Sequence, residues 1–200
     1  MWLTYSKKSG GGYEGKESIF DKFSTDDIIF AFFPCTRFEA KVPLLFRGEA
    51  YQQKKWTLDD KLKYSMELHK ELHRNYMLIS KLVLICNQRN LKIIIENPYT
   101  APHYLTTYWC IRPSIIDKNR RDNGDYYKKP TQYWFINCKP KDNLVFEPIE
   151  YVELMTIDNP KSIDGKSKET TRSMIHPQYA NRFIRQYIID EERIDTIERI

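Results

Sequence analysis

Unbroken apolar runs mark two positions along this chain. The run from Ile28 to Phe33 follows two aspartates and contains no polar residue, a pattern typical of a strand covered on both faces in a parallel sheet. A second run, Ile93 to Ile95, ends at the sequence Glu96-Asn97-Pro98. The two runs therefore predict two buried strands.

Between these runs the apolar residues recur at helical intervals. Thr57 and Asp60 have the spacing of an N-cap and the third position of a helix. The recurring residues are Leu62, Met66, Leu72, Tyr76, Ile79, Val83 and Cys86. A long helix between parallel strands is a crossover, and a right-handed crossover brings both strand ends to one edge of the sheet. We therefore expect Cys35 and Glu96 on the same rim.

The second half of the chain adds further elements. Residues 131–137, TQYWFIN, predict a third strand, and either 144–146 or 151–155 predicts a fourth. A final helix is expected from Pro177 to Ile188, with one apolar stripe. The pattern predicts an α/β fold with a parallel-rich, Rossmann-like sheet.

Polar and glycine-rich stretches set the expected boundaries. Residues 1–25 include SKKSGGGYEGKES, which lacks the strand-turn-helix context of a phosphate-binding loop and is interpreted as a mobile N-terminal segment. Residues 26–200 are expected to form one domain. Within it, residues 158–171 are polar with Pro and Gly and predict a flexible loop.

Composition narrows the classes of function only slightly. Lys and Arg total 32 against 27 Asp and Glu, a net charge of +5, which fits either a functional basic face or an ordinary solvated surface. No apolar segment is long enough for a membrane span or a secretory signal, so a cytoplasmic location is expected. The four cysteines are irregularly spaced and are interpreted as thiols, of which Cys86, Cys110 and Cys138 are expected to be buried.

The expected rim carries a nucleophile and an acid. The Cys35 thiolate is a strong nucleophile, and a partly desolvated Glu96 carboxyl group has a raised pKa, so that it can donate a proton near neutral pH. This pair suits attack on an electron-poor ring, with sulfur adding to carbon while the acid protonates a ring nitrogen. His69 and His73 lie one turn apart, but no third ligand is evident and no metal site is expected.

Four segments in order resemble the DNA cytosine-5 methyltransferases, in a phage or bacterial form. FFPCT and IIIENP are similar to the two catalytic motifs of that family. GDYYKKPTQYWFIN resembles the segment that carries its glutamine and arginines, and RSMIHPQYANRFIRQYI resembles its closing helix. The resemblance covers roughly residues 26–188 and implies a class I methyltransferase sheet, DNA as substrate and S-adenosylmethionine as methyl donor.

The resemblance also implies roles for individual residues. Cys35 would add to carbon 6 of a flipped cytosine and Glu96 would protonate nitrogen 3. Asn97 would orient Glu96, and Pro34 would hold the turn. The cofactor is expected near Pro34, Ser173, Met174 and Ile175. Nucleic-acid contacts are expected from Thr36, Arg37, Arg120, Arg121, Lys128, Lys129 and Thr131.

The chain departs from the family pattern in three places. Only 25 residues precede the segment that begins at residue 26, so we expect the family's strand and Phe-x-Gly-x-Gly loop, which hold the cofactor, to be missing from this segment. Lys129, Thr131 and Tyr133 occupy the best register for the Gln-x-Arg-x-Arg motif, and Lys cannot replace the planar fork of Arg. The segment between Cys138 and Arg172 is also too short for the target-recognition domain expected of the family.

Three functions remain open. The first is a split or truncated cytosine-5 methyltransferase in a bacterial or phage-infected cell, whose cofactor loop comes from a second polypeptide or was lost from the start of the sequence. The second is an inactive descendant that binds nucleic acid or protein. The third uses ENPY as an amino-methyltransferase motif, which would leave Cys35 without a role.

Overall fold

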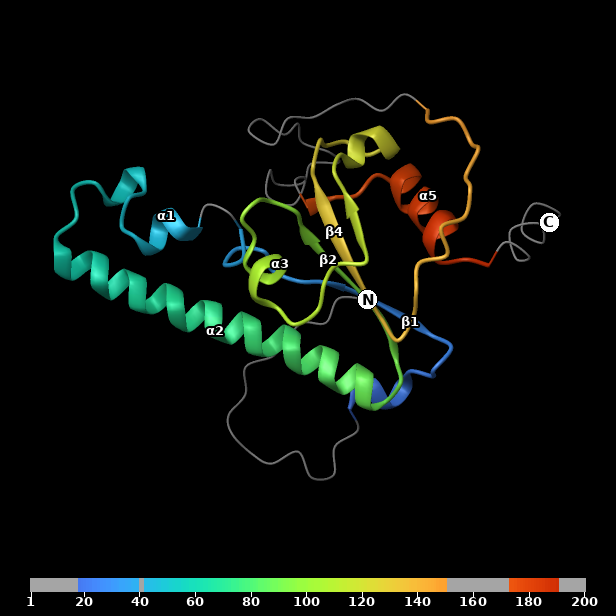
Figure 1. Ribbon diagram of the computed structural model, residues 1–200, viewed down its shortest axis with the longest axis horizontal. Coiled ribbons are helices and arrows are strands. Elements are labelled where there is room, and N and C mark those ends of the chain that lie inside the picture. The colour runs from blue at the N-terminus through green and yellow to red at the C-terminus, as the bar shows by residue number, and fades with distance from the viewer. Residues whose placement is uncertain (1–17, 40–41, 151–172, 191–200) are drawn as a thin grey trace.

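The protein is built around one open sheet of four strands. The computed structural model describes residues 18–39, 42–150 and 173–190. Strands β1 (Ile28–Phe32), β2 (Lys92–Pro98), β4 (Thr131–Ile136) and β3 (Ile115–Asp117) lie in that order. β1 and β2 are parallel, whereas β4 is antiparallel to both β2 and β3. The α/β class is confirmed, but the sheet is mixed, with one parallel pair, and is not parallel-rich as predicted (Figure 1).

A long helix connects the parallel pair. Helix α2 (Leu58–Gln88) begins at Thr57, whose hydroxyl oxygen accepts a hydrogen bond from the Asp60 backbone N–H at 3.2 Å. The predicted crossover is therefore confirmed, with its predicted N-cap. In the register of the pair Phe32 lies opposite Glu96, so both strands end at the same edge of the sheet. The short helix α1 (Val42–Phe46) and the 3-10 turn η2 (Tyr51–Gln53) precede α2.

Each face of the sheet has its own core. Side chains alternate along a strand, so Ile93 and Ile95 of β2 point to one face and Ile94 points to the other. The first core joins the sheet to α2 and to the short helix α3 (Tyr104–Tyr108). The second joins it to α5 (Pro177–Tyr187) through Tyr179 and Phe183. The three layers place α2 and α5 on opposite faces (Figure 1).

Helix α2 is much longer than the strands it covers. Its 31 residues span about 46 Å, whereas the seven residues of β2 span about 23 Å. The N-terminal half of α2 therefore extends past the sheet (Figure 1). Leu62 and Met66 lie on this half and are 54% and 61% exposed, so the helical repeat is confirmed but these two residues do not join the buried face.

Three sequence predictions are corrected by the described residues. Residues 144–146 form no strand, and the short β3 was not predicted. The strand at Ile28–Phe33 was predicted to be buried on both faces, but Phe32 of β1 is 53% exposed. The strands that are buried on both faces are β2 and β4. The segment 18–25, assigned to a mobile terminus, contains the capped 3-10 turn η1 (Ile19–Lys22), whose Phe20 packs against the core.

Other predictions agree with the structure or concern residues outside the described ranges. The final helix and the strand at 131–137 are confirmed as α5 and β4. Residues 1–17, 151–155 and 158–171 lie outside the described residues. Within the described ranges, none of the helices combines the length and the apolar character that crossing a membrane requires.

Candidate active site

Asn97 ties the carboxyl end of β2 to the chain that leaves β1. Its amide nitrogen donates a hydrogen bond to the Phe33 carbonyl oxygen at 3.2 Å. Its amide oxygen lies 3.0 Å from Nε2 of the buried His103, so this ring nitrogen carries the hydrogen and donates it. Burial lowers the pKa of His103 to about 4, which keeps the ring neutral. Asn97, which His103 holds in place, thus joins the ends of the two strands by a hydrogen bond.

The loop that follows β1 is fixed at two further points. Nε of Arg37 donates to a carboxylate oxygen of Glu71 in α2 at 2.5 Å. Phe38 is fully buried, and its carbonyl oxygen accepts from the Tyr104 N–H at 2.9 Å. The Phe38 N–H in turn donates to the Cys35 carbonyl oxygen at 2.8 Å. The loop therefore holds Cys35 in a defined turn at the rim.

The Cys35 side chain is a half-buried thiol. Burial raises its pKa to about 12, and a hydrogen bond to Glu39 and the negative charge of Glu39 add to the effect. The charge of Lys129 opposes the shift. Because a thiolate is the nucleophilic form, Cys35 must pass its proton to a base before it can attack.

Glu96 is the acid of the same rim. The residue is 6% exposed and lies on the α5 side of the sheet, opposite Tyr133 of β4. Burial raises the pKa of the Glu96 carboxyl group, whereas the charges of Lys129 and Arg120 lower it. The charge of Lys129 thus lowers the pKa of both Cys35 and Glu96.

A buried arginine stands beside Glu96. Arg120 belongs to the 3-10 turn η3 (Arg120–Asn123) and is 1% exposed. Its Nη1 lies 3.8 Å from Oε1 of Glu96, and its Nη2 forms an ion pair with Asp125. Its guanidinium carbon sits 4.8 Å from the centre of the Tyr179 ring, within the range of a cation–π contact. Sequence reasoning had placed no arginine beside Glu96; Arg120 lies there, although 3.8 Å is too long for a hydrogen bond to Oε1.

Asp125 connects this cluster to the start of α5. One carboxylate oxygen accepts from the Tyr126 N–H at 2.8 Å and from the His176 N–H at 2.9 Å. Nδ1 of His176 caps α5 by accepting from the Gln178 N–H at 3.1 Å. A buried network therefore runs from Glu96 through Arg120 and Asp125 to His176. The segment expected at the cofactor, residues 173–175, lies directly before His176.

The expected nucleic-acid residues fall into two groups. The prediction of a surface contact with nucleic acid is wrong for Arg120 and Thr131, because both side chains are buried. The Thr131 hydroxyl donates to the Lys129 carbonyl oxygen at 3.2 Å. Thr36, Arg121 and Lys128 are exposed, and Arg37 is engaged with Glu71. Arg120 was misassigned because its neighbours NRRDNGD are typical of a solvated loop.

The expected cofactor residues lie around the rim and before α5. Pro34 and Ser173 are exposed, and Met174 is half-buried. Ile175 packs against the core on the α5 side. Sequence reasoning missed Glu39 and Asp125, because a single acidic residue in a loop carries no pattern that marks it.

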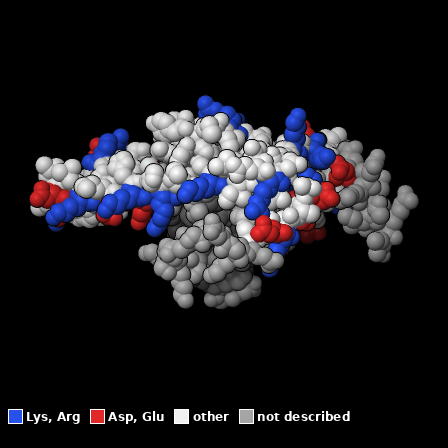
Figure 2. Space-filling model, turned by 90° about the horizontal axis from the view of Figure 1, so that it is seen from below, with Lys and Arg blue, Asp and Glu red and all other residues white. Residues whose placement is uncertain are grey.

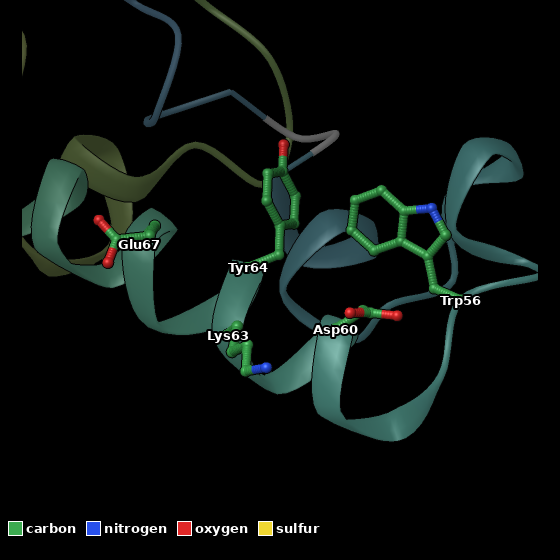
Figure 3. A pocket seen from close by; sticks show the side chains of 5 residues that line it. All are labelled: Trp56, Asp60, Lys63, Tyr64 and Glu67. Atoms are coloured by element: carbon green, nitrogen blue, oxygen red, sulfur yellow. The ribbon is translucent and has the colours of Figure 1, made fainter.

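The other polar features of the structure lie away from the rim. A hollow of about 430 Å³ on the extended half of α2 is lined by Trp56, Asp60, Lys63, Tyr64 and Glu67 (Figure 3). The lower side of the molecule shows Lys and Arg side chains in a row along α2 (Figure 2). Acidic residues are interspersed in this helix, and Lys70 pairs with Glu67 at 2.6 Å, which is typical of a solvated helix face.

The remaining cysteines and histidines have structural surroundings. Cys86 is buried in the core, whereas Cys110 is exposed, which corrects its interpretation as a buried thiol. The His69 ring packs 4.3 Å from the Phe46 ring. Among the described residues no three His, Cys, Asp or Glu side chains gather as metal ligands would.

Comparisons of the chain with protein-family models, with curated proteins and with solved structures gave no match.

Proposed function

We propose that this protein is a DNA cytosine-5 methyltransferase-like protein that acts as a split or truncated form. The observation that carries the proposal is the parallel pair of strands: Cys35 follows the end of β1, and Glu96 of β2 lies opposite Phe32, the last residue of β1. Ligands bind at this edge in open α/β sheets. The mixed four-stranded sheet is compatible with an incomplete class I methyltransferase sheet.

The chemistry follows from the two side chains. The sulfur of Cys35 bonds to carbon 6 of cytosine, and the electron pair of the carbon 5–carbon 6 bond moves toward nitrogen 3. The Glu96 carboxyl group, whose pKa burial raises, gives its proton to that nitrogen. Carbon 5 then becomes nucleophilic. The unpartnered Oε1 of Glu96 supports this role, since a buried carboxyl oxygen with no hydrogen-bond partner suits a ligand N–H or ring nitrogen.

The described residues fit only part of a site for S-adenosylmethionine. Pro34 and the half-buried Met174 and Ile175 could border it. The described glycines, Gly48 and Gly124, stand singly, so these residues contain no glycine-rich loop. When bound, the cofactor would supply the methyl group for carbon 5. We propose that a second polypeptide completes the cofactor site. The test below requires neither the cofactor nor this polypeptide.

Hydrogen exchange at carbon 5 tests the proposal without cofactor. Addition of sulfur makes carbon 5 take a deuteron from D2O, and reversal leaves deuterium in the base. We expect the wild-type chain to put deuterium into cytosine of mixed-sequence DNA, as measured by mass spectrometry. Cys35→Ala should abolish the exchange, and Cys110→Ala, which removes an exposed thiol, should leave it unchanged. No exchange by the wild type on either DNA or RNA would contradict the proposal.

The alternative is an inactive descendant that binds nucleic acid or protein. The raised pKa of Cys35 favours this alternative, because the thiol is the unreactive form. Under it, Cys35→Ala would bind the partner as tightly as the wild type does, and neither protein would exchange carbon 5.

A further inference from the structure

A row of four cations runs along the exposed side of α2. The four residues stand 7, 4 and 7 positions apart, so they lie within about 40° of one another around the helix axis. The row spans about 27 Å at about 1.5 Å per residue. Figure 2 shows Lys and Arg side chains in a line along this helix. All members of the row are exposed: Lys63, Lys70, Arg74 and Lys81.

Two features distinguish this row from an ordinary solvated helix face. The acidic residues of α2 all lie at or before Glu71, so no acid alternates with the cations in the rest of the helix. Of the four cations, only Lys70 forms an ion pair with a described residue, which is Glu67. The positive charge of Arg74 and Lys81 is therefore not balanced by an ion pair within the described part of the chain.

The row passes the loop that carries Cys35. Glu71 lies near the middle of the row in sequence and binds Arg37 of this loop at 2.5 Å. Lys63 belongs to the half of α2 that extends past the sheet, and Lys81 to the half that packs against it (Figure 1). The row therefore continues from the body of the sheet past the rim.

We propose that this row of α2 binds the phosphate backbone of duplex DNA. The inference goes beyond the proposed function, because it concerns a surface outside the rim that binds DNA whether or not Cys35 reacts. A duplex is a rod that carries one negative charge per about 1.7 Å of its axis. A helix holds its cations on a line before binding, and a row of about 27 Å matches about eight base pairs. Such contacts go to phosphates rather than to base edges, so binding should not depend on the DNA sequence.

Removal of the two ends of the row tests the proposal. Fluorescence anisotropy at several NaCl concentrations measures the affinity for a labelled mixed-sequence duplex that is longer than the row. The double variant Lys63→Gln/Lys81→Gln loses two phosphate contacts, so the dependence of log affinity on log salt concentration should become shallower by about 1.8. The affinity at low salt should fall by about tenfold or more.

Lys22→Gln/Lys139→Gln is the matched control, since it removes the same charge from two exposed lysines outside α2. Its affinity and salt dependence should equal those of the wild type. Equal affinities of the two double variants would overturn the inference, because the row would then contribute nothing beyond the total charge. Absence of DNA binding by the wild type would overturn it as well.

A competition experiment distinguishes DNA from an acidic protein as the partner. Unlabelled duplex should displace the labelled duplex at a lower charge concentration than polyglutamate does. Equal displacement by polyglutamate would overturn the assignment to DNA. Carbon 5 exchange keeps this inference separate from the proposed function: at saturating DNA, Lys63→Gln/Lys81→Gln should exchange as fast as the wild type. Absence of exchange in a wild type that binds DNA through the row would contradict the proposed function alone.

Discussion

The two faces of the sheet bury different kinds of side chains. The α2 face buries aliphatic and aromatic side chains such as Ile79, Ile93 and Ile95. The α5 face buries Glu96, Arg120 and Asp125 beside its aromatic residues. Apolar burial stabilises by area alone, whereas a buried charge is tolerated only when it is paired. The buried charged side chains of the described residues therefore belong to the α5 face.

Replacement of Arg120, on the α5 face, should cause the largest loss of stability. Arg120→Met would leave Asp125 buried and without its cation. We expect the free energy of unfolding to fall by about 3–5 kcal/mol, measured by urea unfolding. Arg121→Met is the control, because Arg121 is the exposed neighbour and its loss should change stability by less than about 0.5 kcal/mol. Equal effects of the two variants would show that the buried pairing contributes nothing.

Truncation of Ile79 tests the α2 face in the same way. Ile79 is fully buried in the first core, and Ile79→Ala should cost about 2–4 kcal/mol through lost burial and the cavity that remains. Leu78→Ala, at the exposed position next to it, should cost far less. Unlike the Arg120 variant, Ile79→Ala should change unfolding by the same amount at every pH at which the protein folds. A strong pH dependence of this difference would contradict the apolar surroundings of Ile79.

The pH dependence of stability should separate the faces further. His103 lies with Asn97 on the α2 side, and its pKa falls from 6.5 in the unfolded chain to about 4 when folded. Since the folded pKa is the lower one, stability is complete above pH 6.5 and is lost as the pH falls toward 4. The loss is of the order of 2 kcal/mol. His103→Gln should reduce this slope in urea unfolding series, and an unchanged slope would contradict the prediction.

Glu96 should respond in the opposite direction on the α5 face. Burial raises its pKa above the unfolded value of 4.5, so its contribution to stability is complete at low pH and declines as the pH rises through the folded pKa. The two faces therefore carry titrating groups whose effects on stability run against each other.

The motifs and the crossover were predictable because they depend on local patterns. An apolar run, a helix with Thr57 as its cap, and a second run together require a parallel pair, and this placed Cys35 and Glu96 on one rim. β3 could not be predicted, since its three residues carry no periodicity and pair only because β4 lies beside them. The exposure of Leu62 and Met66 also escaped prediction, because periodicity does not reveal where the sheet stops beneath a helix.

The sequence by itself determined the long helix α2, the strands β1 and β2 on either side of it, and the residue types at their ends, since these depend on contacts within a few positions. Only the tertiary structure decided which charges meet. Arg120 lies 24 positions after Glu96 in a loop that looks solvated, yet the fold buries it 3.8 Å away and pairs it with Asp125. A charge is driven to such a position only when partners from separate segments converge there, and that convergence depends on the packing of the whole sheet.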